Sequence, residues 1–211
     1  MQSQYITPKN MSIFMVLAAL ALWIYLSLPK PLPDMGDMPL PTQKELKKPL
    51  QLKAPDGFQI TATDEYTQEA LIVSTARYKL GKESRLSPVD FALAWGPLTR
   101  KKYLDHIKFF QNGRWYYYQY DGDVSNLSLD FIRDNSANTH IVPEPDNVIL
   151  RDFILGLKKG ETVRLKGYLV RITAKDGWHW NSSRTRNDSG DHSCELMYVT
   201  EGELIPPPAS Q

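Results

Sequence analysis

The hydrophobic pattern of the chain begins with one long uncharged run, residues 11–28, with Lys9 before it and Lys30 after it. At 1.5 Å per residue, this run of about 18 residues gives roughly 27 Å of helix, close to the hydrocarbon thickness of a bilayer. A cleaved signal peptide has a shorter apolar region that ends in a small-x-small cleavage site, and the run ends instead in Ser27-Leu28-Pro29. The pattern therefore predicts an uncleaved, single-pass transmembrane anchor.

The next segment, residues 29–55, has almost no hydrophobic periodicity and contains seven prolines. Proline at this density favours an extended, polyproline-like chain, which suits a spacer. We therefore expect an N-terminal tail (1–10), the transmembrane anchor (11–28), a proline-rich stalk (29–55), one globular domain (56–200) and a disordered tail (201–211).

Within the globular domain, runs rich in β-branched and aromatic residues predict strands. The strongest runs are residues 58–63, 70–78, 106–110, 114–120, 162–173 and 194–200. Asn112-Gly113 lies between two of them and predicts a tight hairpin, because the turn needs residues that tolerate positive φ.

Helix signals are fewer. Ser87 followed by Pro88 is typical of an N-cap and first helical residue, and Gly96-Pro97 would end the helix, so a helix is predicted over 88–95. Further short helices are expected over 99–104 and, from an apolar stripe, over 146–157. The predicted fold class is α+β, with a mainly antiparallel sheet, a few short helices and the N-terminal transmembrane helix.

One long predicted strand contains a glycine in its interior, Gly167. A glycine at such a position predicts a bulge or sharp coil where a small barrel closes. The surrounding G-x-x-V-x-x-x-G-x-L pattern resembles OB-fold and related small barrels. That resemblance implies that the helix over 146–157 caps the barrel and that a strand from Cys194 completes it.

Charge and cysteine content limit the function classes. The chain has 25 basic and 24 acidic residues and a net charge of +1, so nucleic acid is not the expected partner, since nucleic-acid binders have a strongly basic face. The single cysteine, Cys194, cannot form an internal disulfide and is expected to be a buried small hydrophobe. The four histidines are scattered and lack the paired spacing of zinc sites, so we expect no metal and no cofactor.

The C-terminal stretch carries Trp178-x-Trp180, Ser182-Ser183, Arg186-x-Asp188-x-Gly190 and Cys194-Glu195. This resembles the W-x-W-x-S-S-x-x-R-x-D-x-G-x-x-x-C-E signature of a family of bacterial membrane-anchored proteins with no assigned activity. The resemblance implies a place in the bacterial envelope and transfers no catalytic role. A short N-terminal tail before a folded domain is the usual signal-anchor layout, so we expect the inner membrane, with the domain in the periplasm.

Two groups of polar and aromatic residues are candidate binding sites. One group is Ser136, Asn138 and His140, where His140 would serve Ser136 as a base if the two side chains met. The other is Trp178, Trp180, Arg186 and Asp188, in a stretch whose Ser, Asn and Asp residues would also order a long loop by themselves. A buried, hydrogen-bonded His140 is the competing structural interpretation.

These features favour a membrane-anchored binding or assembly module with a protein partner in the envelope, and they do not favour an enzyme. One alternative is a hydrolase-like enzyme that uses His140 and the 178–195 loop, which predicts that His140, Arg186 and Asp188 line one cleft. A second alternative is a binder of glycan or single-stranded nucleic acid on the aromatic strand 115–120. The sequence leaves the oligomeric state open.

Overall fold

The computed structural model describes residues 8–27, 31–183 and 194–208. The chain divides into two compact units, Met1–Pro31 and Leu32–Gln211. The first unit holds helix α1 (Pro8–Ser27), and the large apolar side chains that are described on it, including Phe14 and Val16, are exposed. Within the described residues, no helix combines the length and apolar character needed to cross a membrane.

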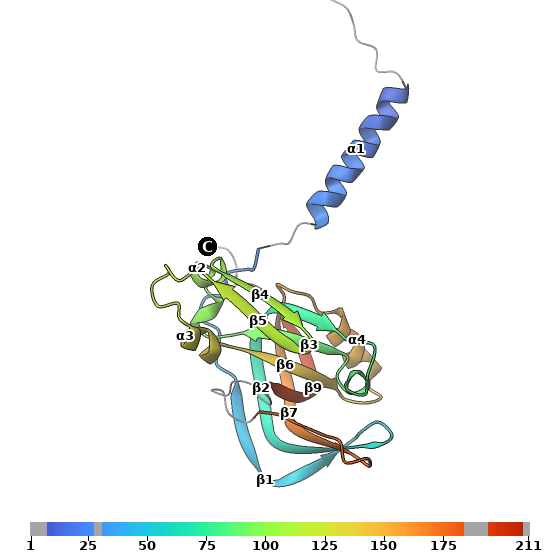
Figure 1. Cartoon of the computed structure of the whole chain (residues 1–211), viewed down its shortest axis with the longest axis vertical. Helices are drawn as coiled ribbons and strands as arrows, with labels where there is room; N and C mark the ends of the chain where they lie inside the picture. Colours follow the sequence, from blue (N-terminus) through green and yellow to red (C-terminus); the bar gives the residue numbers. More distant parts are fainter. Residues whose placement is uncertain (1–7, 28–30, 184–193, 209–211) are drawn as a thin grey trace, which may run out of the picture. The chain divides into compact units, whose positions relative to one another are not determined.

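The second unit is a β-rich structure with a few short helices (Figure 1). Its strands are β1 (Thr42–Leu52), β2 (Phe58–Arg77), β3 (Val89–Ala94), β4 (Ile107–Asn112), β5 (Trp115–Tyr120), β6 (Ser136–Pro143), β7 (Thr162–Ala174), β8 (His179–Asn181) and β9 (Glu195–Ile205). Its helices are the 3-10 turns η1 (Glu83–Arg85) and η2 (Pro97–Thr99) and the α-helices α2 (Lys101–Leu104), α3 (Leu129–Asp134) and α4 (Val148–Gly156). The predicted α+β class is confirmed.

Among the described residues, five strands form a closed ring of pairings. β2 pairs with β3, β3 with β6, β6 with β9, β9 with β7, and β7 returns to β2. Each pairing is antiparallel except β6–β9, which is parallel. β1 and β8 lie outside this ring, β1 against β2 and β8 against β7.

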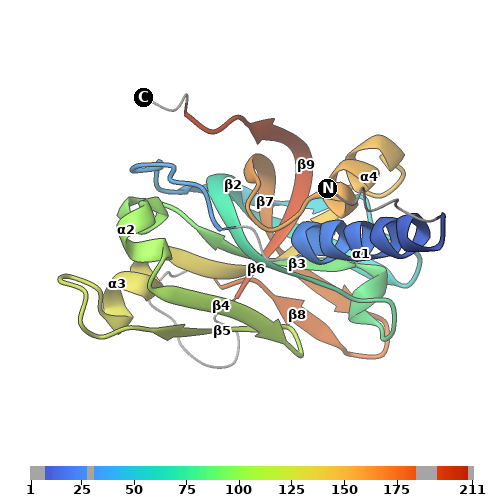
Figure 2. The same ribbon diagram turned by 90° about the horizontal axis from the view of Figure 1, so that it is seen from above.

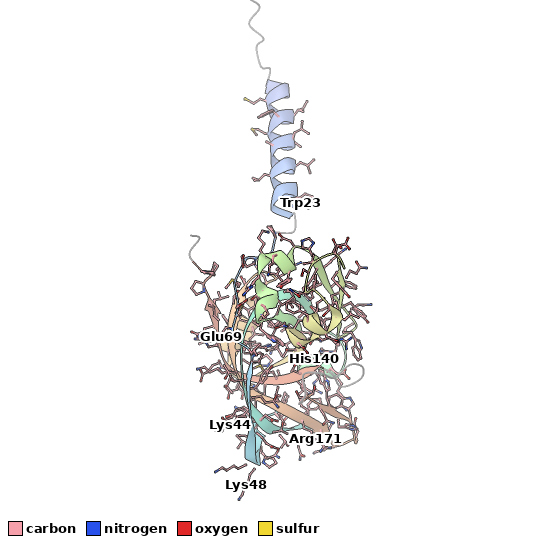
Figure 3. The ribbon with its side chains drawn as sticks, turned by 90° about the vertical axis from the view of Figure 1, so that its left-hand side faces the viewer. Trp23, Lys44, Lys48, Glu69, His140 and Arg171 are labelled. Carbon is pink, nitrogen blue, oxygen red and sulfur yellow. The ribbon has the colours of Figure 1, made fainter. Side chains whose placement is uncertain are left out.

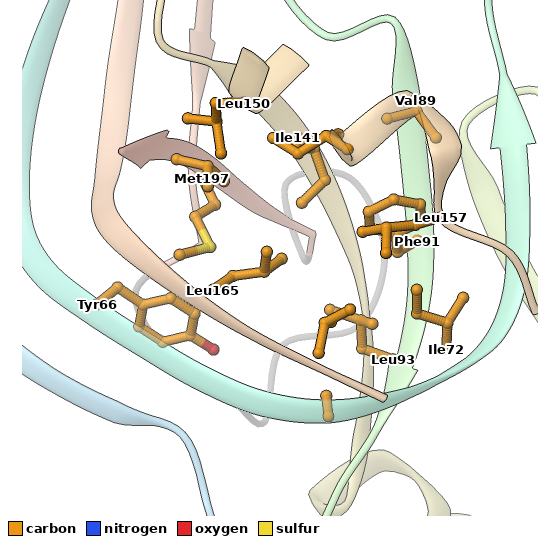
Figure 4. Close-up of a cluster of buried hydrophobic side chains, with 14 of the residues drawn as sticks. Tyr66, Ile72, Val89, Phe91, Leu93, Ile141, Leu150, Leu157, Leu165 and Met197 are labelled. Carbon is orange, nitrogen blue, oxygen red and sulfur yellow. The ribbon is translucent and has the colours of Figure 1, made fainter. Parts of the chain in front are cut away.

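The interior of the ring holds the main hydrophobic core (Figure 4). Phe91 and Leu93 of β3, Ile141 of β6 and Leu165 of β7 point into it. Helix α4 adds Leu150 and Ile154 to the same cluster, and Leu157, directly after the helix, joins them. The helix predicted over 146–157 is thus present with slightly shorter bounds, and it packs against the interior of the ring.

Gly167 lies in β7, directly against the backbone of β9. The register between these strands shifts between Lys166 and Gly167, and a Cβ on Gly167 would lie 1.9 Å from the carbonyl oxygen of Tyr198. This confirms the prediction that the glycine marks a bulge.

The long connection between β3 and β6 packs on the outer side of the ring. Its hairpin, β4–β5, lies beside β3 and β6 (Figure 2). A second hydrophobic cluster joins the connection to the outer face of β2 and β3: Leu71, Val73, Ala92 and Ala94 pack with Leu98, Leu104, Ile107, Phe109, Leu127 and Ile132. The predicted hairpin is confirmed, but its turn lies one residue later than Asn112-Gly113. Asn112 pairs with Trp115 as the last residue of β4, and the two turn residues are Gly113 (φ 56°) and Arg114 (φ 68°).

The helix predicted over 88–95 is wrong, because these residues form β3. Both faces of the strand are buried, with Phe91 toward the core and Ala92 toward the outer cluster. A doubly buried strand loses the polar alternation that would distinguish it from a buried helix. The helix predicted over 99–104 resolves into η2 and α2, and the separate strands predicted over 58–63 and 70–78 are one strand, β2.

The stalk predicted over 29–55 is also wrong for most of its length. Met38 is buried and forms a bridge to Gly96, and β1 pairs with β2 from Thr42 onward. β1 is an edge strand with exposed lysines, among them Lys44 and Lys48 (Figure 3), and its pairing breaks between Glu45 and Leu50, where Pro49 lies. Proline is tolerated at such an edge irregularity. The tail predicted from residue 201 belongs to β9 as far as Ile205.

Candidate functional site

Two neighbouring strands of the ring carry polar side chains on their outer face. β3 supplies Asp90, and β6 supplies Ser136, Asn138 and His140 at alternate positions. Asp90 and His140 are register partners, so their side chains emerge next to each other on the same face.

Asp90 is the centre of this cluster and is fully buried. Its Oδ1 accepts hydrogen bonds from Arg114 Nη1 (3.0 Å) and from the Ser87 hydroxyl (3.2 Å). Its Oδ2 lies 2.9 Å from His140 Nδ1, an electrostatic contact that is not aligned as a hydrogen bond. A buried carboxylate needs such partners, because removing a charge from water costs several kcal/mol.

Arg114 reaches Asp90 from the turn of the β4–β5 hairpin. Its guanidinium packs against two aromatic rings, 4.0 Å from the centroid of Tyr78 and 5.2 Å from that of Trp180. Its Nη2 donates to the Ser87 carbonyl (2.9 Å), and its backbone N–H donates to the Tyr78 hydroxyl (3.1 Å). The hairpin is therefore fixed to the ring through one buried ion pair and its aromatic neighbours.

The Tyr78 phenol and the Cys194 thiol, which lie beside this ion pair, are both neutral at physiological pH. Burial, followed by the nearby Asp90 carboxylate, raises the pKa of Tyr78 to about 12. Burial also raises the pKa of the half-buried Cys194 thiol to about 12.

Asn138 connects the hairpin to Cys194. Its Nδ2 donates to the carbonyl of Arg114 (3.0 Å) and to Cys194 Sγ (3.6 Å), and its Oδ1 accepts from Gln111 Nε2 (2.7 Å). The amide thus has partners on both ends and holds the hairpin turn in place.

A cavity of about 380 Å³ opens beside this cluster. It is lined by Glu83, Gly113, Arg114, Trp115, His140, Trp178, His179, Trp180, Asn181 and Cys194. The ring of Trp180 lies 4.8 Å from that of His140 and 6.1 Å from that of Trp178. The position of His140 within the fold is labelled in Figure 3. We call this cavity the β3–β6 pocket.

A larger hollow, of about 610 Å³, lies elsewhere, among Lys53, Arg85, Val142, Asp146 and Arg151. Loop residues supply most of its lining, and its ion pair, Lys53–Asp146, is exposed. We therefore place the candidate site in the β3–β6 pocket, which lies beside the largely buried Arg114–Asp90 ion pair.

The structure brings together some of the residues that the sequence singled out and separates others. His140, Trp178 and Trp180 line the pocket, and Asn138 supports it. Ser136 is buried elsewhere: its hydroxyl donates to the Ile132 carbonyl (2.7 Å). The pairing of Ser136 with His140 as nucleophile and base is therefore wrong.

Arg186 and Asp188 lie outside the described residues, so their convergence with His140 stays a prediction.

Sequence reasoning missed Asp90 and Arg114, the two charges at the centre of the site. The helix predicted over 88–95 places Asp90 in its first turn, whereas in the structure Asp90 lies in β3 and is the register partner of His140. The Asn112-Gly113 signal places the positive-φ positions at these two residues, so it gave no sign that Arg114 lies in the turn.

Within the part of the chain that the structure describes, no group of three or more His, Cys, Asp or Glu side chains is arranged to hold a metal ion. Comparison with protein-family models, with curated proteins and with solved structures gives no match. The function is therefore argued from the site itself.

Proposed function

We propose that the chain is a ligand-binding module built on an OB-type barrel. Numbered along the ring, β2, β3, β6, β7 and β9 are strands one to five, the parallel pair joins strands three and five, and α4 lies between strands three and four. In OB folds, the face of strands two and three, with the loops between strands one and two and between strands four and five, binds oligonucleotides and oligosaccharides.

One observation carries the proposal: the β3–β6 pocket lies on that same face. Its lining includes Glu83 from the loop between strands one and two, Arg114 from the hairpin between strands two and three, and His140 from strand three. Trp180 comes from the connection between strands four and five, and the buried Asp90 of strand two contacts Arg114 and His140. Four separate parts of the sequence thus contribute to one cavity, which is typical of a binding site.

The chemistry of the pocket supports binding more than catalysis. Asp90 Oδ1 accepts two hydrogen bonds and its Oδ2 contacts His140, the Arg114 guanidinium packs against the rings of Tyr78 and Trp180, and the Cys194 thiol keeps its proton. Side chains fixed in this way lose little conformational freedom when a ligand arrives, which favours affinity.

A crosslinking experiment tests the pocket. A photoreactive residue replaces Asn181, which lines the pocket, in the full-length chain expressed in bacteria, and a matched chain carries it at Ile149, an exposed position on α4. We expect a discrete adduct from position 181 that position 149 does not give. Equal adducts from both positions, or none from position 181, would refute the proposal.

We further propose that the N-terminal apolar run holds this module at the bacterial inner membrane, with the barrel in the periplasm and an envelope protein as its partner. The support is the uncharged sequence of residues 11–28 and the exposure of large side chains along α1, such as Phe14 and Leu17. A large exposed apolar surface of this kind is typical of a segment that contacts a membrane or another protein.

Fractionation tests the membrane proposal. The full-length chain should stay in the membrane pellet after alkaline carbonate extraction, whereas a chain that begins at Leu32 should be released. Fusion of a periplasm-dependent reporter after Gln211 should be active. Release of the full-length chain, or an inactive reporter, would reject this placement.

A further inference from the structure

We infer that the ligand of the β3–β6 pocket is a linear, uncharged glycan, which enters the pocket at one end and continues along the exposed face of the β4–β5 hairpin. The inference rests on the proposed function, since it names the class of ligand for the same site.

The exposed face of the hairpin continues the aromatic lining of the pocket. Trp115 lines the pocket beside Trp178 and Trp180. Tyr117, two residues further along β5, shares the face of Trp115, and its ring is stacked with that of Phe110 from β4, with centroids 5.4 Å apart and planes at 17°. Trp115, Tyr117 and Phe110 are 36%, 44% and 39% exposed. We call these five aromatic residues the aromatic track.

Polar side chains alternate with the aromatic residues along this track. His179 and Asn181 lie in the pocket, and Asn112 and Gln119 are exposed on the hairpin face. A flat ring beside a planar amide suits a sugar, whose C–H face packs on the ring while its hydroxyl groups take hydrogen bonds. An apolar protein surface or an acyl chain would leave these amides without partners.

Charge argues against a polyanionic ligand at this face. Arg114 is neutralised by Asp90, and Lys82, near Trp178, pairs with Asp176 at 2.5 Å. Glu83 adds a negative charge to the pocket lining, and Lys108 adds a positive one on the hairpin face. Single-stranded nucleic acid would need a continuous basic groove beside the stacking rings, and the described residues of this face do not provide one.

Co-sedimentation of the full-length chain in detergent with insoluble glycans tests the inference. The probes are chitin, cellulose and purified peptidoglycan, with a poly(dT) oligonucleotide as the polyanionic comparison. We expect binding to at least one glycan: binding to chitin or cellulose would indicate a free polysaccharide as the source of the sugar chemistry, and binding to peptidoglycan alone would indicate cell-wall glycan. Binding to poly(dT) alone, or to no probe, would overturn the inference.

Two single substitutions locate the binding surface. Trp115→Ala and Tyr117→Ala each remove one exposed ring from the track, and we expect each to weaken glycan binding about fivefold. Ile149→Ala, at an exposed apolar position on α4, serves as the matched control and should bind as the native chain does. Unchanged thermal unfolding of the variants shows that they remain folded.

Equal glycan binding by all three variants would overturn the inference. Failure of the glycan inference is distinguishable from failure of the pocket itself: a crosslinked adduct at position 181 that contains no carbohydrate would retain the binding site and reject the glycan.

Discussion

Arg114 shows how a single residue carries both the geometry and the charge of the site. Its φ of 68° lies in the left-handed region that residues other than glycine, asparagine and aspartate rarely adopt. The contacts that offset this strain are the ion pair with Asp90 and the stacking on Tyr78. The turn and the pocket are therefore stabilised by the same side chain.

Replacing Arg114 by asparagine should lower the free energy of unfolding by about 3 kcal/mol, because the buried Asp90 carboxylate loses its cation. Asparagine tolerates the left-handed backbone conformation, so the loss of stability measures the removal of the positive charge and not strain in the turn. Urea unfolding measures it. The double variant Asp90→Asn, Arg114→Asn should regain part of the loss, and a double variant less stable than the single one would argue against the ion pair as the cause.

Cys194 should make stability depend on pH in the alkaline range. Its pKa is about 12 in the folded chain against an ordinary value of 9.0, so between these values the unfolded chain has lost the thiol proton and the folded chain has kept it. The contribution of the thiol is complete below pH 9 and is lost as pH rises toward 12.

Urea unfolding of the native chain and of Cys194→Ala, at about pH 8 and about pH 10, measures this effect. The native chain should lose more stability between the two pH values than the variant. The comparison removes the contribution of the tyrosines, which titrate in both chains. An identical pH dependence would mean that the thiol is not buried as described.

At the scale of single elements, sequence patterns predicted β2, β4, β5, β7 and β9 and the hairpin, and failed at the doubly buried β3 and the proline-containing edge strand β1. Asn112-Gly113 and Gly167 carry their information locally, so the hairpin and the bulge were predictable. The outer face of β3 is buried because the β3–β6 connection packs over it. This is a tertiary contact, so the local sequence around Asp90 does not predict it.

The bulge at Gly167 gives a prediction at this scale. Gly167→Ala should cost about 3 kcal/mol of folding stability, because the added Cβ overlaps the Tyr198 carbonyl and the strands must separate. Gly156→Ala is the control: it lies at the end of α4 with open space around it and should be neutral or slightly stabilising. Thermal unfolding compares the two variants. Similar melting temperatures would show that β7 and β9 adjust freely there.

For the whole second unit, the boundary was the main error of the sequence-based view. Proline spacing suggested a stalk up to residue 55, yet Met35 and Met38 form backbone hydrogen bonds with Thr99 and Gly96. Such contacts join segments about sixty residues apart. The composition of residues 29–55 is typical of a spacer. These residues become part of the fold because β1 pairs with β2.

A chain that starts at Asp56 should therefore be less stable than one that starts at Leu32. Loss of the buried Met38 alone should cost about 2 kcal/mol, and loss of β1 exposes the edge of β2. Thermal unfolding of both chains measures the difference, and Met38→Ala in the longer chain isolates the side-chain contribution. Equal melting temperatures would restore the stalk interpretation.

The pairing of β2 with β7 has a kinetic consequence. It joins Phe58 to Ala174, so the ring cannot close until segments distant in sequence have met. Contacts of this kind are formed late and slowly, on the millisecond-to-second scale typical of β-rich domains, whereas the β4–β5 hairpin is local and forms early. Until closure, β2 and β7 have unpaired edges that other chains can join. Refolding yield should accordingly fall as protein concentration rises.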